Sequence, residues 1–118
     1  MAGKLVHVEI NAADADRAQG FWSGVFGWEV GAPMSPEMDY RMFRTAEDQG
    51  GAIYPADKPG LIVYFDTDDI DASLAKVREL GGRTEDKQPI PRVGWFARCS
   101  DTEGNDFSLF QADDSVAP

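Results

Sequence analysis

The chain has 118 residues, of which 42% are hydrophobic, and this is enough to form the core of one domain. Its formal net charge of −10 argues against a nucleic-acid partner and against an anionic membrane surface, because both need clustered Lys and Arg side chains. No apolar run is long enough to span a membrane, no signal-peptide pattern opens the chain, and the single cysteine excludes an internal disulfide, so we expect a cytoplasmic protein.

The first half of the chain predicts a strand, then a helix, then three short strands. Residues 5–10 alternate between apolar and polar, which places His7 and Glu9 on the face opposite the helix. Asp14 is expected to cap an amphipathic helix that ends at Gly27. The strands expected after this helix are residues 28–31, 40–45 and 51–54, with a proline-containing loop at residues 32–39.

The second half repeats this order, with Ile62 in the place of His7. Either Asp68 or Asp69 is expected to cap a second amphipathic helix, which ends at residues 81–82. The expected strands are residues 61–66, 83–87, 94–100 and 106–111, with a loop at residues 88–92 and a linker between the halves at residues 57–60.

The repeat predicts an α+β fold of two βαβββ modules, about residues 4–56 and 60–112. Each sheet would bury one face under its own helix, and the two uncovered faces can curl around a central cup with the helices outside. By alternation along the strands, the side chains expected to line the cup are His7, Glu9, Ile62, Tyr64, Ser108 and Phe110. Further aromatic candidates for this pocket are Tyr40, Phe43, Tyr54, Trp95 and Phe96.

Four stretches of the sequence have a recognisable order and spacing. They are His7 in the first strand, residues 26–29 (FGWE) after the first helix, residues 80–82 (LGG) after the second helix, and residues 101–105 (DTEGN) in the last turn. With these stretches the βαβββ repeat resembles the vicinal oxygen chelate superfamily, which includes glyoxalase I, bleomycin-resistance proteins and extradiol dioxygenases. The resemblance covers almost the whole chain, although Thr102 stands where the family has a proline.

The resemblance implies a metal site inside the cup, since catalytic members bind one divalent ion through His, Glu or Gln on the first and last strand of each module. Only His7 keeps such a position, because Ile62 stands at the second, Ser108 stands where Glu is usual, and residues 51–53 offer no ligand. Glu9 lies on the same strand as His7, and two ligands from one strand do not make a site. We therefore expect no cofactor; a Zn, Ni, Mn or Fe ion is the less favoured alternative.

His7 is the expected catalytic residue if the chain is an enzyme, as a general base with an ordinary pKa of about 6.5. Glu9 would orient His7 or act as the acid; the alternative is that both side chains are structural. Cys99 has no adjacent base in the sequence and is expected to be buried and inert. Arg41 and Arg98 lie on expected strands, where each would meet either an anionic ligand or solvent.

Three functions are compatible with these features. The favoured interpretation is a metal-independent protein that binds a small organic molecule in the cup, like the bleomycin-resistance members. The second is a lyase, isomerase or dioxygenase-type enzyme that uses His7 and Glu9, with or without a divalent metal. The third is an interaction module without a ligand. The exposed strand edges also favour a homodimer.

Overall fold

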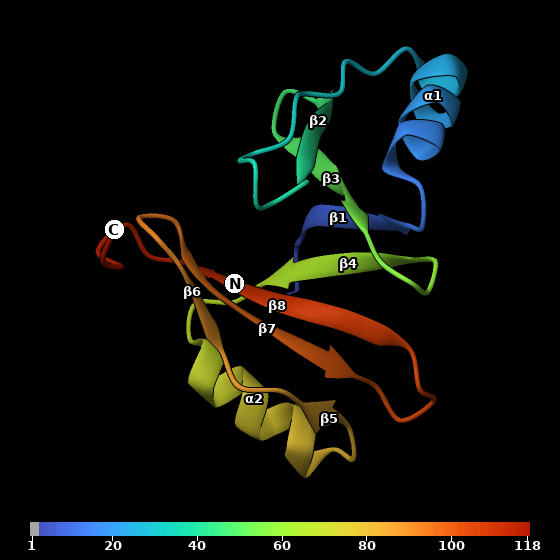
Figure 1. The fold of residues 1–118 in the computed structure, drawn as a ribbon. Coiled ribbons are helices and arrows are strands. Elements are labelled where there is room, and N and C mark those ends of the chain that lie inside the picture. Colours follow the sequence, from blue (N-terminus) through green and yellow to red (C-terminus); the bar gives the residue numbers. More distant parts are fainter. Residues whose placement is uncertain (1–2) are drawn as a thin grey trace. The chain divides into compact units, whose positions relative to one another are not determined.

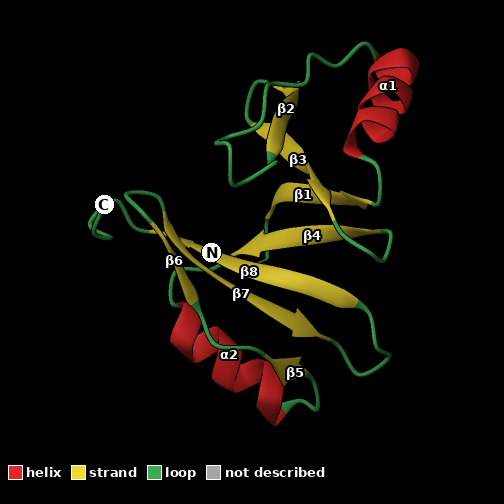
Figure 2. Cartoon of the chain, viewed as in Figure 1, coloured by secondary structure: helices red, strands yellow, loops and turns green. Residues whose placement is uncertain are grey.

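Figure 1 shows the computed structural model of the chain, in which residues 3–118 are described. Within this range, two helices and eight strands confirm the α+β class predicted from the sequence (Figure 2). The expectation that no signal peptide opens the chain concerns in part residues 1–2, which lie outside the described residues. In chain order the elements are β1 (Leu5–Ala12), α1 (Ala15–Phe26), β2 (Arg41–Ala46), β3 (Gln49–Pro55), β4 (Gly60–Asp66), α2 (Ile70–Glu79), β5 (Arg83–Thr84), β6 (Gln88–Ile90), β7 (Gly94–Ser100) and β8 (Asp106–Ala112).

The chain divides into two compact units. Module one is His7–Ile62, and module two is residues 63–118 together with residues 3–6. Residues 3–6 belong to module two because the Asp66 backbone N–H donates to the Lys4 carbonyl, and the Gly3 N–H donates to the Asp66 carbonyl, each at 2.9 Å. The division between the two units therefore falls inside β4, and the predicted sequence modules, with their linker at residues 57–60, stay a prediction.

Module one has a three-stranded sheet, in which β3 pairs in parallel with β1 and antiparallel with β2. The strand predicted at residues 28–31 does not form. Here the Gly31 N–H donates to the Met42 carbonyl at 2.9 Å, but the pairing goes no further. Ala32-Pro33 follows directly, and proline has no N–H with which to extend a ladder. Module one is thus βαββ, one strand short of the prediction.

Helix α1 has the start and the end that its sequence predicts. The Asp14 carboxylate accepts the Arg17 backbone N–H at 2.9 Å, which satisfies one of the free N–H groups of the first turn. Gly27 follows the helix with φ of 73°, a left-handed conformation, and its N–H donates to the Ser23 carbonyl at 2.7 Å. This stop turns the chain sharply, so that residues 28–31 run back toward β2.

In module two, β4 pairs in parallel with β8, β8 pairs antiparallel with β7, and β7 also pairs with β5 and β6. The first strand thus pairs in parallel with the last strand in both modules, which supports the predicted repeat. Two boundaries differ from the prediction. The strand expected at residues 83–87 is limited to β5, and the loop expected at residues 88–92 contains β6, whose Pro89 fits an edge strand.

Each module buries an apolar core between its helix and one face of its sheet. Helix α2 is capped by Asp69, the second of the two predicted caps, whose carboxylate accepts the Ala72 N–H at 3.0 Å. The core of module one is Ile10, Ala15, Phe43 and Ile53, and the core of module two is Ile70, Leu74, Ala97, Cys99 and Leu109.

Among residues 3–118, no helix is long and apolar enough to cross a membrane.

Candidate functional site

The single histidine of the chain is hydrogen-bonded to a tyrosine within module one. His7 Nε2 lies 2.7 Å from the Tyr40 hydroxyl, and the tautomer of the imidazole decides which of the two donates. The two rings are parallel within 7°, with centroids 6.2 Å apart, and Tyr54 lies 5.4 Å from Tyr40. Residues from β1, from β3 and from the segment before β2 therefore meet around one imidazole.

The strand register places this group on the face of the sheet that α1 does not cover. Glu9 lies opposite Ala52, and Ala52 lies opposite Met42, so these side chains share one face. The alternate residues of the same strands form the core under α1. The predicted placement of His7, Glu9, Tyr40 and Tyr54 on this face agrees with the register, and Glu9 is only 2% exposed. Phe43 points to the other face, into the core under α1, and it also borders the cavity described below.

Burial lowers the pKa of His7 below its ordinary value, because an imidazolium is poorly solvated away from water. The charge of Glu9 acts in the opposite direction but is the smaller influence. His7 is therefore a neutral imidazole at pH 7, which has one nitrogen that donates and one that accepts a hydrogen bond. In this state it can hold a polar ligand group or take up a proton.

A cavity of about 1020 Å³ opens beside His7 within module one. It is largely open to solvent, and its volume lies just above the range of small-molecule sites, which span about 300–1,000 Å³. One wall is the segment after α1, and the other is the hairpin of β2 and β3, where Gly51 has no room for a side chain because a Cβ would lie 2.1 Å from the Val8 carbonyl. The lining residues are His7, 27–31, 42–44 and 47–51.

The apolar part of the cavity wall belongs to a continuous aromatic stack. Trp28 lies flat on Phe43, with centroids 4.5 Å apart and planes within 7°. On the side of α1, Trp28 contacts Phe26 at 4.9 Å and Trp22 at 5.7 Å. The sequence analysis placed Trp28 in a family motif but did not predict it as a cavity residue, and it missed Met42. The signal available for Trp28 was its place directly after Gly27, where the chain turns back toward the sheet.

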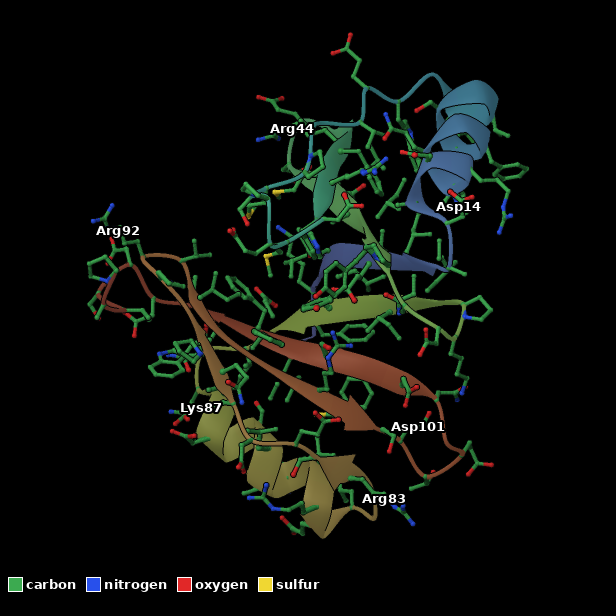
Figure 3. The ribbon with its side chains drawn as sticks, viewed as in Figure 1. Asp14, Arg44, Arg83, Lys87, Arg92 and Asp101 are labelled. Atoms are coloured by element: carbon green, nitrogen blue, oxygen red, sulfur yellow. The ribbon has the colours of Figure 1, made fainter. Side chains whose placement is uncertain are left out.

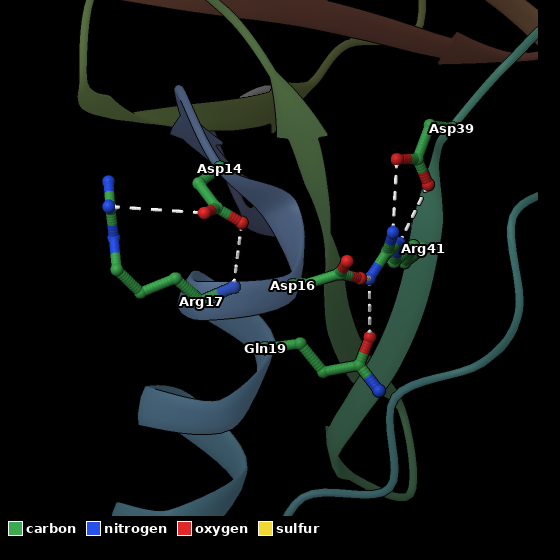
Figure 4. A network of polar contacts seen from close by, with 6 residues as sticks. All are labelled: Asp14, Asp16, Arg17, Gln19, Asp39 and Arg41. Carbon is green, nitrogen blue, oxygen red and sulfur yellow. Dashed lines mark hydrogen bonds and ion pairs between the residues drawn. The ribbon is translucent and has the colours of Figure 1, made fainter.

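Arg41 fixes the segment that carries Tyr40 to the start of α1 (Figure 4). Its guanidinium donates to the Asp39 carboxylate at 2.7 and 3.1 Å, to Asp16 at 2.8 Å and to Gln19 at 2.9 Å. These carboxylates raise the pKa of Arg41 further above its ordinary value. The sequence left open whether Arg41 meets an anionic ligand or solvent. In the structure its donors bind Asp39, Asp16 and Gln19 instead.

In module two, the face of the sheet that α2 does not cover carries a different set of side chains. Tyr64 lies opposite Ser108, and Ser108 lies opposite Arg98, so the three form a row across β4, β8 and β7. Ser108 is completely buried, and its Oγ has no hydrogen-bond partner among residues 3–118. Phe96 and Phe110 also lie opposite each other, and Tyr64 is 6.4 Å from Phe96. Ile62 is half-buried in β4, two residues before Tyr64.

Trp95 is on the wrong face for the predicted pocket. It packs against the core under α2, its indole N–H donates to Asp113 at 3.4 Å, and Lys87 lies 4.6 Å above its ring. Its neighbour Phe96 takes the uncovered face, as the alternation along β7 requires. Cys99 is buried in the α2 core, as predicted, and burial raises the pKa of its thiol to about 11. At neutral pH it is therefore a protonated, unreactive thiol.

The donor set for a metal ion is incomplete. Within residues 3–118, no three His, Cys, Asp or Glu side chains lie close enough together to hold an ion. His7 has Glu9 on the same strand face, but the other positions implied by the family resemblance are Ile62, Ser108 and residues 51–53. These residues do not fit a divalent metal, and we derive no chemical step through one.

Comparison with known sequences gives a consistent assignment. The glyoxalase-like domain family matches residues 7–110 of this chain. A glyoxylase-like domain-containing protein of Didymella fabae is 30% identical over 119 residues, which cover 91% of this chain and 92% of that protein. Two mycobacterial relatives are each 30% identical over 92% of this chain, which spans only 44% of their length.

Solved structures with this fold have lower sequence identity. Methylmalonyl-CoA epimerase of Mycobacterium tuberculosis is 16% identical with a TM-score of 0.69, over 94% of this chain and 88% of that one. Homoprotocatechuate 2,3-dioxygenase of Brevibacterium fuscum is 21% identical with a TM-score of 0.72, over 94% of this chain and 37% of that one. At these identities the likeness establishes the fold alone.

Proposed function

Because this chain belongs to the glyoxalase-like domain family, we propose that it binds a small organic molecule in the cavity of module one, without a metal. The resemblance to the vicinal oxygen chelate superfamily is confirmed by the family match and by the structural neighbours. That superfamily includes members with and without a metal, so the absence of a metal here is part of the proposal. The predicted cup between the modules stays a prediction.

The observation that carries the proposal is the cavity beside His7. It combines an apolar wall, formed by Trp28, Val30 and Phe43, with the neutral imidazole of His7 as a polar group. This is the usual composition of a ligand site, in which apolar contacts supply most of the affinity and a few polar groups set the orientation. Tyr40 holds the imidazole in place from the side by its hydrogen bond.

Tryptophan fluorescence tests this proposal directly, because Trp28 lines the cavity and Trp95 lies in module two. A panel of planar aromatic compounds would be titrated into the protein, and we expect saturable quenching by at least one compound. In Trp28→Phe the quenching should fall strongly, whereas in Trp95→Phe, the matched control, it should persist. No response from any compound, or a response lost only in Trp95→Phe, would contradict the proposal.

The second candidate function is an enzyme of the lyase, isomerase or dioxygenase type. The neutral state of His7 supports this candidate. A neutral imidazole next to a tyrosine hydroxyl can accept a proton from a bound substrate, with Glu9 as a nearby carboxylate. The structural neighbours include an epimerase and a dioxygenase. Elemental analysis of protein purified without chelators distinguishes a metal enzyme from a metal-independent binding protein. Stoichiometric Zn, Ni, Mn or Fe would favour the enzyme and contradict metal-independent binding.

We also propose that the protein is a cytoplasmic homodimer without a nucleic-acid or membrane partner. Three apolar side chains of α1, Phe21, Val25 and Phe26, are more than half exposed, and such a patch favours contact with another protein surface. The net charge of −10 supports the absence of nucleic acid and of anionic membranes as partners. Size-exclusion chromatography with light scattering measures the mass in solution, and a monomer at all concentrations would contradict the dimer.

A further inference from the structure

The cavity of module one lies where module two has a paired strand. We infer that this cavity binds molecules with an extended, peptide-like backbone, which form hydrogen bonds to strand edges that module one leaves unpaired. The inference rests on the proposed small-molecule binding and names the class of ligand. The observations that carry it come from the segment after each helix, where the two modules can be compared residue by residue.

The segments after the two helices begin and end in the same way. Each begins with a glycine in the left-handed conformation, Gly27 with φ of 73° and Gly81 with φ of 96°. Four residues later in each segment, a backbone N–H donates to the strand beside it, from Gly31 at 2.9 Å and from Glu85 at 2.8 Å. Residues 29–30 of module one are therefore the counterparts of β5 in module two.

In module two, the ladder continues beyond this hydrogen bond. The acceptor is the Arg98 carbonyl, and both residues of β5 then pair with residues 99–100 of β7. Figure 3 shows Arg83, the first residue of β5, which lies opposite Ser100. The short strand β5 is therefore part of the sheet of module two.

In module one, the ladder stops at the same hydrogen bond. The acceptor is the Met42 carbonyl, but no strand pairs with this edge of β2 among residues 3–118. The backbone of residues 28–30 forms no hydrogen bond within the part of the chain that the structure describes. Alternate residues of a strand direct their peptide groups to the same edge, so those of Arg44 point to the side of the Met42 carbonyl. The cavity lies between these two unpaired edges.

One position in each segment explains why the two ladders differ. In module two, Gly82 follows the left-handed glycine, and a Cβ there would lie 2.6 Å from the Ser100 carbonyl oxygen. The chain can approach β7 closely because this residue has no side chain. The counterpart in module one is Trp28, whose indole lies on Phe43 with centroids 4.5 Å apart. Trp28 thus holds the residues after it away from β2 and keeps the place of the missing strand open.

An extended backbone suits this place because its polar groups match those of the two edges. Strand addition binds a peptide through main-chain N–H and C=O groups and depends less on its side chains. A ligand without such groups would displace water from the edges and leave their N–H and C=O groups without partners, which costs affinity. Short peptides, and molecules with similarly spaced amide groups, are therefore the expected ligand class.

The test uses capped tripeptides of the form acetyl-Ala-Xaa-Ala-amide, with Val, Phe, Gln or Lys at the central position. Each is titrated into the isotope-labelled full chain, and NMR follows the backbone amides. We expect saturable binding of at least one peptide. At a peptide concentration of about ten times Kd, solvent exchange of the Glu29 and Arg44 amides should slow about tenfold. The Glu85 amide, which is already hydrogen-bonded in module two, is the internal control and should not change.

Two changes test whether the backbone is what the cavity recognises. N-Methylation of the amide groups of the best peptide keeps its side chains but removes its donors, and it should weaken binding about tenfold or more. Trp28→Gly introduces the residue of module two, so residues 29–30 should pair with β2 and peptide binding should be lost. Trp95→Phe, in module two, is the matched control and should bind the peptide as wild type does. Circular dichroism checks that both variants fold, and the N-methylated peptide gives a test in wild type that needs no variant.

Each outcome has a separate meaning. If no capped peptide binds but a compound of the aromatic panel does, the ligand class is wrong and the proposed function stands. If the N-methylated peptide binds as tightly as its parent, or if folded Trp28→Gly binds the peptide like wild type, recognition through the unpaired edges is wrong. If neither the peptides nor the panel bind, the proposed function fails as well. Binding that is lost on N-methylation and in Trp28→Gly, but not in Trp95→Phe, would support the inference.

Discussion

The two modules share a strand–helix–strand order but bury their helices to different extents. In module two, α2 places Ile70 and Leu74 in the core, where they are 1% and 6% exposed. In module one, the only buried residue of α1 is Ala15, and Phe21 is 61% exposed. Trp22 and Trp28 fill the space between α1 and the sheet, and the cavity opens beside them. The fully packed module is thus the scaffold, and the less packed one carries the candidate site.

The largest expected effect concerns this difference in packing. Leu74→Ala removes a buried side chain from the α2 core and should destabilise the protein by about 2–5 kcal/mol. Val25→Ala, at an apolar position of α1 that is more than half exposed, should change stability by about 0.5 kcal/mol or less. Urea unfolding measures both. Similar losses for the two variants would mean that α1 is covered in solution, as by a second copy of the chain.

A smaller effect is expected where α1 is held by polar contacts. Arg41→Gln removes the hydrogen bonds to Asp39, Asp16 and Gln19 from a side chain that is only 13% exposed. We expect a loss of about 1–2 kcal/mol, discounted because Asp16 is exposed. Arg17→Gln is the control, because Arg17 is exposed and lies 3.9 Å from Asp14, and it should cost about 0.5 kcal/mol or less.

The role of Arg41 can also be tested through the pKa of His7, which a general loss of stability would not change. Because Arg41 binds Asp39 and directly follows Tyr40, its loss should loosen the Tyr40–His7 hydrogen bond and move the His7 pKa, measured by NMR. An unchanged His7 pKa in folded Arg41→Gln would show that Tyr40 is held by other contacts.

The free energy of unfolding should depend on pH through His7, the only histidine of the chain. In the unfolded chain His7 takes up a proton at about pH 6.5, whereas in the folded chain its pKa is lower. The unfolded state therefore binds more protons in that window, and stability falls as the pH decreases from about 6.5 toward the folded pKa. The slope from this group is at most about 1.4 kcal/mol per pH unit.

Replacing His7 by Gln should remove this contribution, which comparison of urea unfolding of both proteins between about pH 5 and 7 would reveal. Carboxylates titrate in both proteins, so the difference between the two curves isolates His7. Identical slopes in wild type and His7→Gln would show that His7 is solvated in the folded state.

The sequence predicted regular elements well because their signals are local. Asp14, Asp69 and Gly27 are found at the helix ends where capping chemistry requires them, and alternation placed His7 and Ser108 on the uncovered faces. The errors arose where tertiary contacts decide. Alternation along a single strand could not tell that Trp95 would face α2, because that depends on which neighbour covers each face of the sheet.

The cavity itself could not be predicted from the sequence. It depends on how far α1 lies from the sheet and on the path of residues 27–31, which the sequence analysis took for a strand. A loop and a regular strand at that place differ by a few backbone hydrogen bonds, of which only the one from Gly31 forms. Volume left between elements is a property of packing, and no local pattern encodes it.

The smallest expected effect is at Ser108, the residue in module two that stands where metal-binding relatives of the superfamily usually have Glu. Its Oγ is completely buried without a hydrogen-bond partner among residues 3–118, so its desolvation is uncompensated. Ser108→Ala should therefore leave stability unchanged or raise it by up to about 1 kcal/mol. Thr67→Val is the contrast, because the Thr67 hydroxyl bonds Ser73 at 2.6 Å and accepts the Asp69 N–H at 3.2 Å, and its loss should cost about 1–2 kcal/mol. If Ser108→Ala were instead as destabilising as Thr67→Val, the Ser108 hydroxyl would have a hydrogen-bond partner in solution, and the expectation of an uncompensated hydroxyl would be wrong.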